Sequence, residues 1–292
     1  MSFAKLKKNR GSIDVLKQKI EQLNQKQSYG DDRIWYPKRD KAGNAYCIIR
    51  FLPAGGDEDV PWVQLFSHGF KGPGGKWYIE NCPTTISGQC PVCEANNELW
   101  NSGHDADKDV ARGRKRKLSY ISNILVIKDS AEPENEGKVF LYKFGKKIFG
   151  KIEDLMDPEF EDETPVNPYD LWAGADFKLK VRKFEGYANY DKSEFAEPSA
   201  LYDGDEKQLE AMYDGLYPLQ EIVAPDKFKK YDELKTRLFQ TVGQSTKGET
   251  DAGEAAPAPE QPSAEAAQEE AVPADGAEQE EGMEFFKKLA AE

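Results

Sequence analysis

Apolar and polar side chains alternate along several short stretches of this 292-residue chain, which is the pattern of half-buried β-strands. In residues 177–182, Phe177, Leu179 and Val181 are expected to face a core, and the lysines and arginine between them to form a cationic outer face. Further strands are predicted at residues 45–52, 62–68, 76–80, 119–128 and 138–144.

Helical spacing appears first near the N-terminus. Ile13, Leu16, Ile20 and Leu23 recur every three or four positions after Ser12, a residue that can cap a helix. A lone helix of this length is marginal in water, so it is expected to pack either on its own core or on a neighbouring copy of the chain.

Two more helices are predicted in the middle of the chain. One covers residues 146–156, and the other is capped by Asp226 and places Phe228, Tyr231, Leu234 and Leu238 on one face. Because strands and helices are mixed, the fold class expected from the pattern is α+β.

Composition divides the chain into three regions. A basic segment with the amphipathic helix covers residues 1–30, an α+β core covers residues 31–243, and an acidic tail covers residues 244–292. The tail has almost nothing to bury, so it is predicted to be disordered and self-repelling. Its apolar tip, which contains Phe285 and Phe286, is interpreted as a docking peptide, with a terminal helix resting on the core as the alternative.

The formal net charge of -13 hides a strong segregation of charge. Residues 249–282 contain eleven acidic residues and no lysine or arginine, so the rest of the chain is close to neutral. Two basic segments stand out in that remainder. They are Lys5, Lys7, Lys8 and Arg10 at the start, and Lys108, Arg112, Arg114, Lys115, Arg116 and Lys117 in the middle.

One histidine and three cysteines have the spacing of a metal site. His68 and Cys82 are followed by Cys90 and Cys93, and the Cys-x-x-Cys pair can supply two ligands from one tight turn. A turn at residues 72–75 would bring His68 and Cys82 together. Three thiolates and one imidazole leave no open position for water, so the cofactor predicted is one structural Zn²⁺. The alternatives are a fortuitous group of buried side chains and a redox pair at Cys90 and Cys93.

Aromatic residues follow the second basic segment. Tyr120 comes three positions after its last residue, Lys117, and Tyr142, Lys146, Lys147, Tyr187 and Tyr190 lie farther along the chain. Single-stranded nucleic acid is bound by cations along its phosphates and by aromatic faces on which its bases stack. We therefore expect these residues to share one groove that binds single-stranded DNA, with preference between DNA and RNA left open.

Several strings resemble the single-stranded-DNA-binding, helix-destabilising proteins of T-even-type bacteriophages. They include His68-Gly-Phe-Lys, Cys90-Pro-Val-Cys93, Lys115-Arg-Lys and Asn123-Ile-Leu-Val126. The resemblance implies an oligonucleotide-binding (OB) fold, a five-stranded barrel, joined to a zinc-bearing subdomain. It places the zinc ligands on His68, Cys82, Cys90 and Cys93. It places DNA contacts on Lys115, Arg116, Tyr120, Tyr142, Tyr187 and Tyr190.

The resemblance also implies partners. It implies that the N-terminal basic segment and helix mediate cooperative self-association on single-stranded DNA. It further implies that the acidic tail recruits phage replication, recombination and repair proteins, such as a polymerase, a helicase loader, a primase and a recombination mediator. No apolar run is long enough to cross a membrane and no secretory signal is visible, so we expect a protein of the host cytoplasm.

Two other classes of function remain as alternatives. A metal-dependent nuclease is disfavoured because the chain has only two histidines and no phosphate-binding loop spacing. An adaptor that uses its basic segment to bind an acidic protein is the second alternative. We expect no catalytic residue.

Overall fold

The computed structural model describes residues 31–56, 58–160 and 162–243. The predicted N-terminal helix, the first basic segment and the acidic tail with its apolar tip lie outside these residues. Within the described part, the chain forms two compact units. Unit 1 comprises residues 31–65 and 118–227, and unit 2 comprises residues 66–117 and 228–243.

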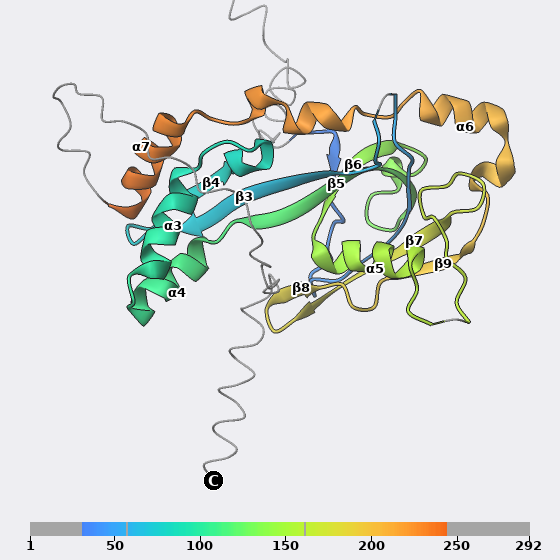
Figure 1. Cartoon of the computed structure of the whole chain (residues 1–292). Coiled ribbons are helices and arrows are strands. Elements are labelled where there is room, and N and C mark those ends of the chain that lie inside the picture. Colours follow the sequence, from blue (N-terminus) through green and yellow to red (C-terminus); the bar gives the residue numbers. More distant parts are fainter. Residues whose placement is uncertain (1–30, 57, 161, 244–292) are drawn as a thin grey trace, which may run out of the picture. The chain divides into compact units, whose positions relative to one another are not determined.

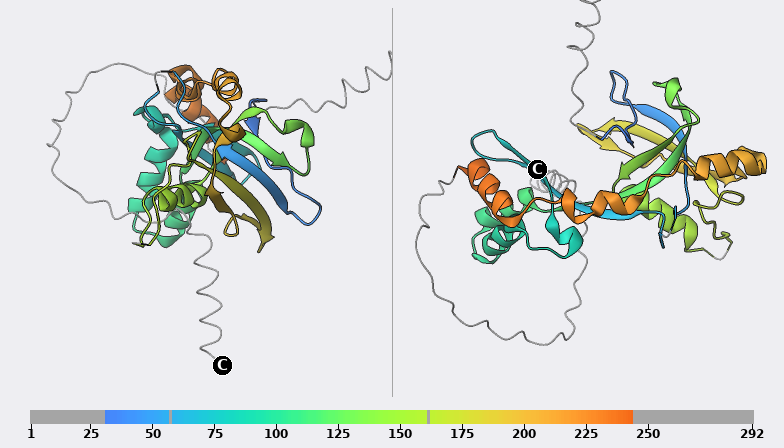
Figure 2. Two further views of the ribbon diagram at one scale, coloured as in Figure 1. Left: turned by 90° about the vertical axis from the view of Figure 1, so that its right-hand side faces the viewer. Right: turned by 90° about the horizontal axis from the view of Figure 1, so that it is seen from above.

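Unit 1 is built on a mixed β-sheet (Figure 1). Its strands, in sheet order, are β1 (Ile34–Trp35), β6 (Val139–Phe144), β5 (Lys117–Asp129), β2 (Ala45–Phe51) and β7 (Ala175–Phe184), and both β8 (Tyr187–Asn189) and β9 (Glu194–Pro198) pair with β7. Strands β1 and β6 are parallel, whereas the pairs around β2 and β5 are antiparallel. The blue strand β2 and the olive strand β7 lie side by side in both views of Figure 2.

This sheet is open in the described residues, because no pairing joins β1 to β7, β8 or β9. The α+β class predicted from the pattern is confirmed. The five-stranded barrel implied by the resemblance is not confirmed by these pairings and stays a prediction.

The alternation predicted for residues 177–182 is confirmed. Phe177, Leu179 and Val181 are buried in β7 and join the main core of unit 1. Of the cations between them, Lys180 forms an ion pair with Glu194 and Arg182 forms one with Asp191. The cationic outer face of this strand is therefore partly neutralised.

Unit 1 also contains helices and short 3-10 turns. They are η2 (Pro133–Asn135), α5 (Lys146–Met156), η3 (Leu201–Gly204), α6 (Glu206–Tyr213), η4 (Leu219–Val223) and η5 (Pro225–Lys227). Of these, η2 and α5 lie between its strands, and the others follow its last strand, β9. Helix α5 has the bounds predicted from the sequence. Asp226 does not begin a helix of the predicted kind, because it lies in the separate turn η5 and the next helix starts at Tyr231.

Unit 2 packs a β-hairpin against three helices. Strand β3 (Val63–Lys71) enters it from unit 1 and pairs with β4 (Trp77–Asn81), and the turn η1 (Pro83–Ile86) follows. The helices are α3 (Pro91–Asn101), α4 (Asp105–Arg114) and α7 (Tyr231–Val242), which appear together in Figure 1. Helix α3 contacts both α4 and α7, and α7 also contacts β4.

Sequence patterns did not predict α3 and α4. Helix α4 buries only Ala111, so its sequence carries no apolar period that would indicate a helix. Its first turn instead holds Asp105 and Asp107 and its last turn holds Arg112 and Arg114, which suits the helix dipole. The basic segment therefore begins in a helix and continues into β5.

No helix in the described part of the chain is both long and apolar enough to cross a membrane.

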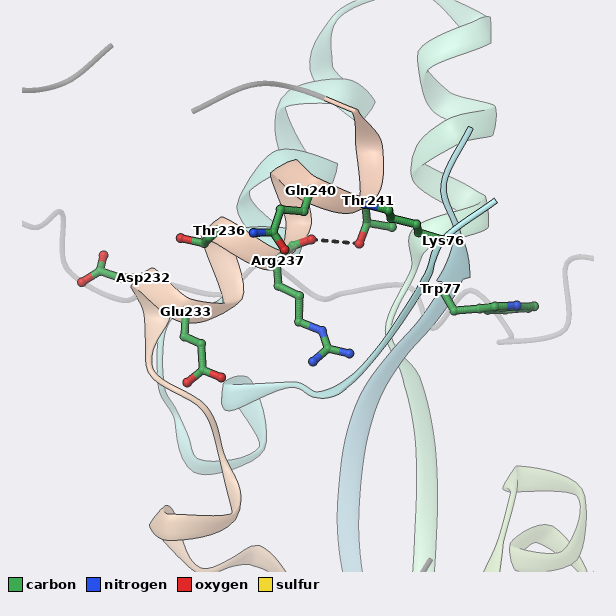
Figure 3. A pocket seen from close by; sticks show the side chains of 8 residues that line it. All are labelled: Lys76, Trp77, Asp232, Glu233, Thr236, Arg237, Gln240 and Thr241. Atoms are coloured by element: carbon green, nitrogen blue, oxygen red, sulfur yellow. Dashed lines mark hydrogen bonds between the residues drawn. The ribbon is translucent and has the colours of Figure 1, made fainter. Parts of the chain in front are cut away.

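The hairpin turn approaches the last turn of α7 very closely. The amide of Gly72 donates to the carbonyl of Lys76 over 2.8 Å, and Lys76 lies beside Thr241 in Figure 3. A Cβ placed on Gly72 would lie 1.9 Å from the carbonyl oxygen of Thr241. Position 72 therefore requires glycine, because the backbone of Thr241 leaves no room for a Cβ atom.

We predict that Gly72→Ala destabilises unit 2 by about 1–3 kcal/mol, because two backbone segments must separate. Calorimetry of the full chain should show a lower unfolding midpoint. Gly74→Ala is the matched control, because a Cβ there meets nothing within 4 Å. Equal midpoints for the two variants would contradict the close approach.

Candidate metal centre and basic segment

Three elements of unit 2 bring the four candidate ligands together. His68 lies in β3 opposite Glu80 of β4, and Cys82 follows the end of β4. Cys90 occupies the position just before α3 and Cys93 lies in the first turn of that helix. Their ligand atoms all lie within 4.8 Å of one another. The prediction that the hairpin would join His68 to Cys82 is confirmed.

The distances within this cluster fit a tetrahedral ion. The Nε2 atom of His68 lies 3.5 Å from the sulfur of Cys90 and 3.4 Å from that of Cys93, and the sulfurs of Cys82 and Cys93 are 3.6 Å apart. Bonds of about 2.3 Å to sulfur and about 2.0 Å to nitrogen would place tetrahedral ligand atoms roughly 3.5–3.8 Å apart. The donor atoms therefore fit one metal ion.

The orientation of His68 is fixed from its other side. Its Nδ1 lies 2.9 Å from the carbonyl oxygen of Arg114. A carbonyl can only accept, so Nδ1 carries the proton and Nε2 is left with the lone pair that a metal requires. This hydrogen bond also ties the ligand cluster to the basic segment.

The cluster is shielded from water. His68, Cys82 and Cys90 are buried, and Cys93 is partly buried. Hydrogen bonds from Cys90, which has the largest effect, and from Cys93 hold the pKa of the Cys82 thiol far below its usual value. The cluster therefore favours Cys82 as a thiolate. Four protein ligands around one position leave the centre closed, as in structural sites.

Two arginines of the second basic segment rest on neutral groups of unit 2. Arg114 lies 5.5 Å from the centre of the Phe70 ring, and Arg116 lies 4.3 Å from that of Phe66. Arg116 also donates to the hydroxyl of Thr84 over 2.7 Å. Arg112 differs, because it pairs with the carboxylate of Asp109.

The charges of Arg114, Lys115, Arg116 and Lys117 are uncompensated locally. None of the ion pairs among the described residues includes any of the four. Lys115, Arg116 and Lys117 are also exposed to solvent. A run of exposed cations without acidic partners is able to bind an anionic polymer.

Two of the predicted base-stacking tyrosines lie in the core of unit 1. Tyr120 and Tyr142 are 6% and 3% exposed. The ring of Tyr120 stacks on that of Phe149 with centres 3.8 Å apart and planes 3° apart, so Phe149 covers one of its faces. Burial also raises the pKa of Tyr142 well above its ordinary value.

The other predicted contacts of unit 1 are more accessible. Tyr187 in β8 is 65% exposed, and Tyr190 is partly buried against the core. Lys146 and Lys147 are exposed in the first turn of α5. Because Arg116 belongs to unit 2 and these residues belong to unit 1, a groove shared by all of them stays a prediction.

A pocket of about 740 Å³ in unit 2 is a less suitable site for an anionic ligand. It is lined by α7 and the start of β4, and Figure 3 shows Asp232 and Glu233 on the same helix as Arg237. Arg237 is neutralised by Glu80 over 2.8 Å. The pocket therefore has mixed charge, unlike the basic segment.

Comparison with known proteins places this arrangement in a family. Residues 43–242 match the family described as gp32 DNA binding protein like. This chain belongs to that family. The matched residues include all four candidate ligands and the second basic segment, so the resemblance inferred from the sequence strings is confirmed.

Relatives of the family come from T-even-type phages. The protein named Single-stranded DNA-binding protein in Enterobacteria phage T4 is 41% identical over 247 residues, which cover 82% of this chain and 80% of the relative. The protein of the same name in Enterobacteria phage T2 is 44% identical over 224 residues, covering 75% of this chain and 72% of the relative.

Sequence reasoning missed the residues that hold the basic segment in place. Phe66 and Thr84 were not singled out, although Arg116 contacts both. A hydroxyl two positions after a thiol ligand, as in Cys82-Pro-Thr84, is a usable signal because such a group can reach the sulfur. An aromatic ring beside a cation cannot be found from residues 50 positions apart.

We predict that Cys93→Ala reduces the content of bound divalent metal from about one per chain to well below one after dialysis, because one of four ligands is lost. Elemental analysis measures the metal content per chain. Cys47→Ala is the control, since Cys47 is buried in unit 1 beside Asp129. Loss of metal from both variants, or from neither, would contradict the assignment of the site.

Proposed function

We propose that this chain binds single-stranded DNA through the second basic segment, on a core braced by one structural zinc ion. One observation carries the proposal: the cations from Arg114 to Lys117 have no acidic partner among the described residues and adjoin the ligand cluster. The printed names of the phage T4 and T2 relatives, Single-stranded DNA-binding protein, support the same ligand.

Zinc is the ion that suits this donor set. Three sulfurs and one imidazole nitrogen form a soft, tetrahedral set, whereas calcium and magnesium require oxygen ligands. When bound, the ion would hold the hairpin to α3 and would supply folding free energy. With four protein ligands it would not activate water, so we propose no catalytic residue.

The proposed contacts divide according to chemistry. Arg112, Arg114, Lys115, Arg116 and Lys117 would bind phosphates together with Lys146 and Lys147, and binding would release counterions from the strand. Tyr187 offers a free face for base stacking, which contributes about 1–3 kcal/mol per base. Tyr120, Tyr142 and Tyr190 would contribute only the parts of their rings that the core leaves exposed. We further propose that the sheet of unit 1 serves as the oligonucleotide-binding barrel.

Residues outside the described part would add the cooperative and regulatory functions. We propose that Lys5, Lys7, Lys8 and Arg10 with the first helix join neighbouring copies on one strand. The acidic tail would compete with DNA for the basic segment and would recruit replication, recombination and repair proteins. Binding of single strands alone destabilises a duplex by mass action.

We predict that Lys115→Ala lowers the slope of log affinity against log salt by about 0.7 for a short single-stranded oligonucleotide, because one phosphate contact is lost. Fluorescence anisotropy at several salt concentrations measures the slope. Lys41→Ala removes the same charge from an exposed position in unit 1 and should leave the slope unchanged.

Two results would count against the proposal. A wild-type chain whose affinity does not depend on salt would exclude phosphate contacts as the main source of binding. Equal slopes for wild type, Lys115→Ala and Lys41→Ala would show that the second basic segment does not contact the strand.

A further inference from the structure

The hydroxyl of Thr84 lies between the ligand cluster and the basic segment. Thr84 belongs to η1, which starts directly after Cys82. Its oxygen lies 3.1 Å from the sulfur of Cys82 and 2.7 Å from Nη1 of Arg116. A single side chain therefore touches a candidate metal ligand and a candidate DNA contact.

The direction of these two hydrogen bonds follows from the donors present. A guanidinium can only donate, so Arg116 donates to the oxygen of Thr84. The hydroxyl has one proton of its own, and a metal-bound thiolate can only accept. With Cys82 as a metal-bound thiolate, Arg116 would donate to Thr84 and Thr84 would donate to the sulfur of Cys82.

A second contact holds the guanidinium from the side of Phe66. Arg116 lies 4.3 Å from the centre of that ring. Phe66 is itself held to η1, because its amide donates to the hydroxyl of Thr85 over 3.0 Å and its carbonyl accepts from the amide of Cys82 over 2.8 Å. Both contacts of Arg116 thus depend on the residues around Cys82.

These contacts orient Arg116 without cancelling its charge. A hydroxyl and an aromatic ring are neutral, and no ion pair among the described residues involves Arg116. Arg237 is the contrast, since it pairs with the carboxylate of Glu80 over 2.8 Å. An arginine that is oriented but still charged loses less conformational entropy when it binds a phosphate.

We propose that Thr84 is a positioning residue: it orients Arg116 toward the phosphate of a bound strand and links that orientation to the ligation of Cys82. The proposal rests on the proposed function and adds a residue that acts through Arg116. It predicts that the hydroxyl, and not the size or shape of the side chain, is what the position requires.

The test compares Thr84→Val, which removes the hydroxyl at nearly constant size, with Thr84→Ser, which keeps it. Affinity for a short oligo-dT strand should fall about three- to tenfold for Thr84→Val and should be restored by Thr84→Ser. In a double-mutant cycle, Thr84→Val should add no further loss to Arg116→Ala, because its effect passes through Arg116.

A spectroscopic readout tests the link to the metal without DNA. With Co²⁺ in place of the native ion, the sulfur-to-metal charge-transfer band should shift in Thr84→Val, because Cys82 loses a hydrogen bond, and should return in Thr84→Ser. Thr84→Ala serves as a second variant if Thr84→Val does not bind one Co²⁺ per chain.

The outcomes separate this proposal from the proposed function. If wild type binds the strand but the variants lacking the hydroxyl bind equally well, Thr84 does not position Arg116. The same conclusion follows if the double variant loses affinity by the product of the two single losses. An unshifted Co²⁺ band would overturn the link to Cys82. A wild-type chain that does not bind oligo-dT would overturn the proposed function itself.

Discussion

The convergence of four ligand atoms in unit 2 is the constraint on which the rest of this account depends. His68, Cys82, Cys90 and Cys93 come from a strand, the end of a second strand and the start of a helix, yet their ligand atoms lie within 4.8 Å. The apolar core around them is small. Buried thiolates without a metal would repel one another, so an ion at this position would stabilise the whole unit.

The same cluster organises the surface beside it. The carbonyl of Arg114 orients His68, and Thr84 connects Cys82 to Arg116. Folding of the centre and placement of the cations are therefore physically connected. Arg114 and Arg116 rest on aromatic rings and, for Arg116, a hydroxyl, so their charge stays available for an anionic partner. Neutral groups thus support side chains whose charge remains exposed. Such charges contact phosphates, which are the same at every base, so we expect this surface to tolerate any base sequence.

Much of this arrangement could be predicted from the sequence because its signals are local. The spacing of His68, Cys82, Cys90 and Cys93 identified the cluster, and strict alternation identified β7. Helices α3 and α4 were not predicted, because they are short and mostly polar, and packing rather than periodicity stabilises them. The burial of Tyr120 against Phe149 was also unpredictable, since a strand tyrosine next to a basic run has the same sequence pattern whether it faces the core or solvent.

Hydrogen exchange of the full chain, before and after treatment with a metal chelator, tests the central claim most directly. Removal of the metal by a chelator should speed amide exchange in α3 and in residues 112–117, because both depend on the ligand cluster. Strands β2 and β7 of unit 1 should exchange as before. Unchanged exchange in residues 112–117 would show that the metal centre does not support the basic segment.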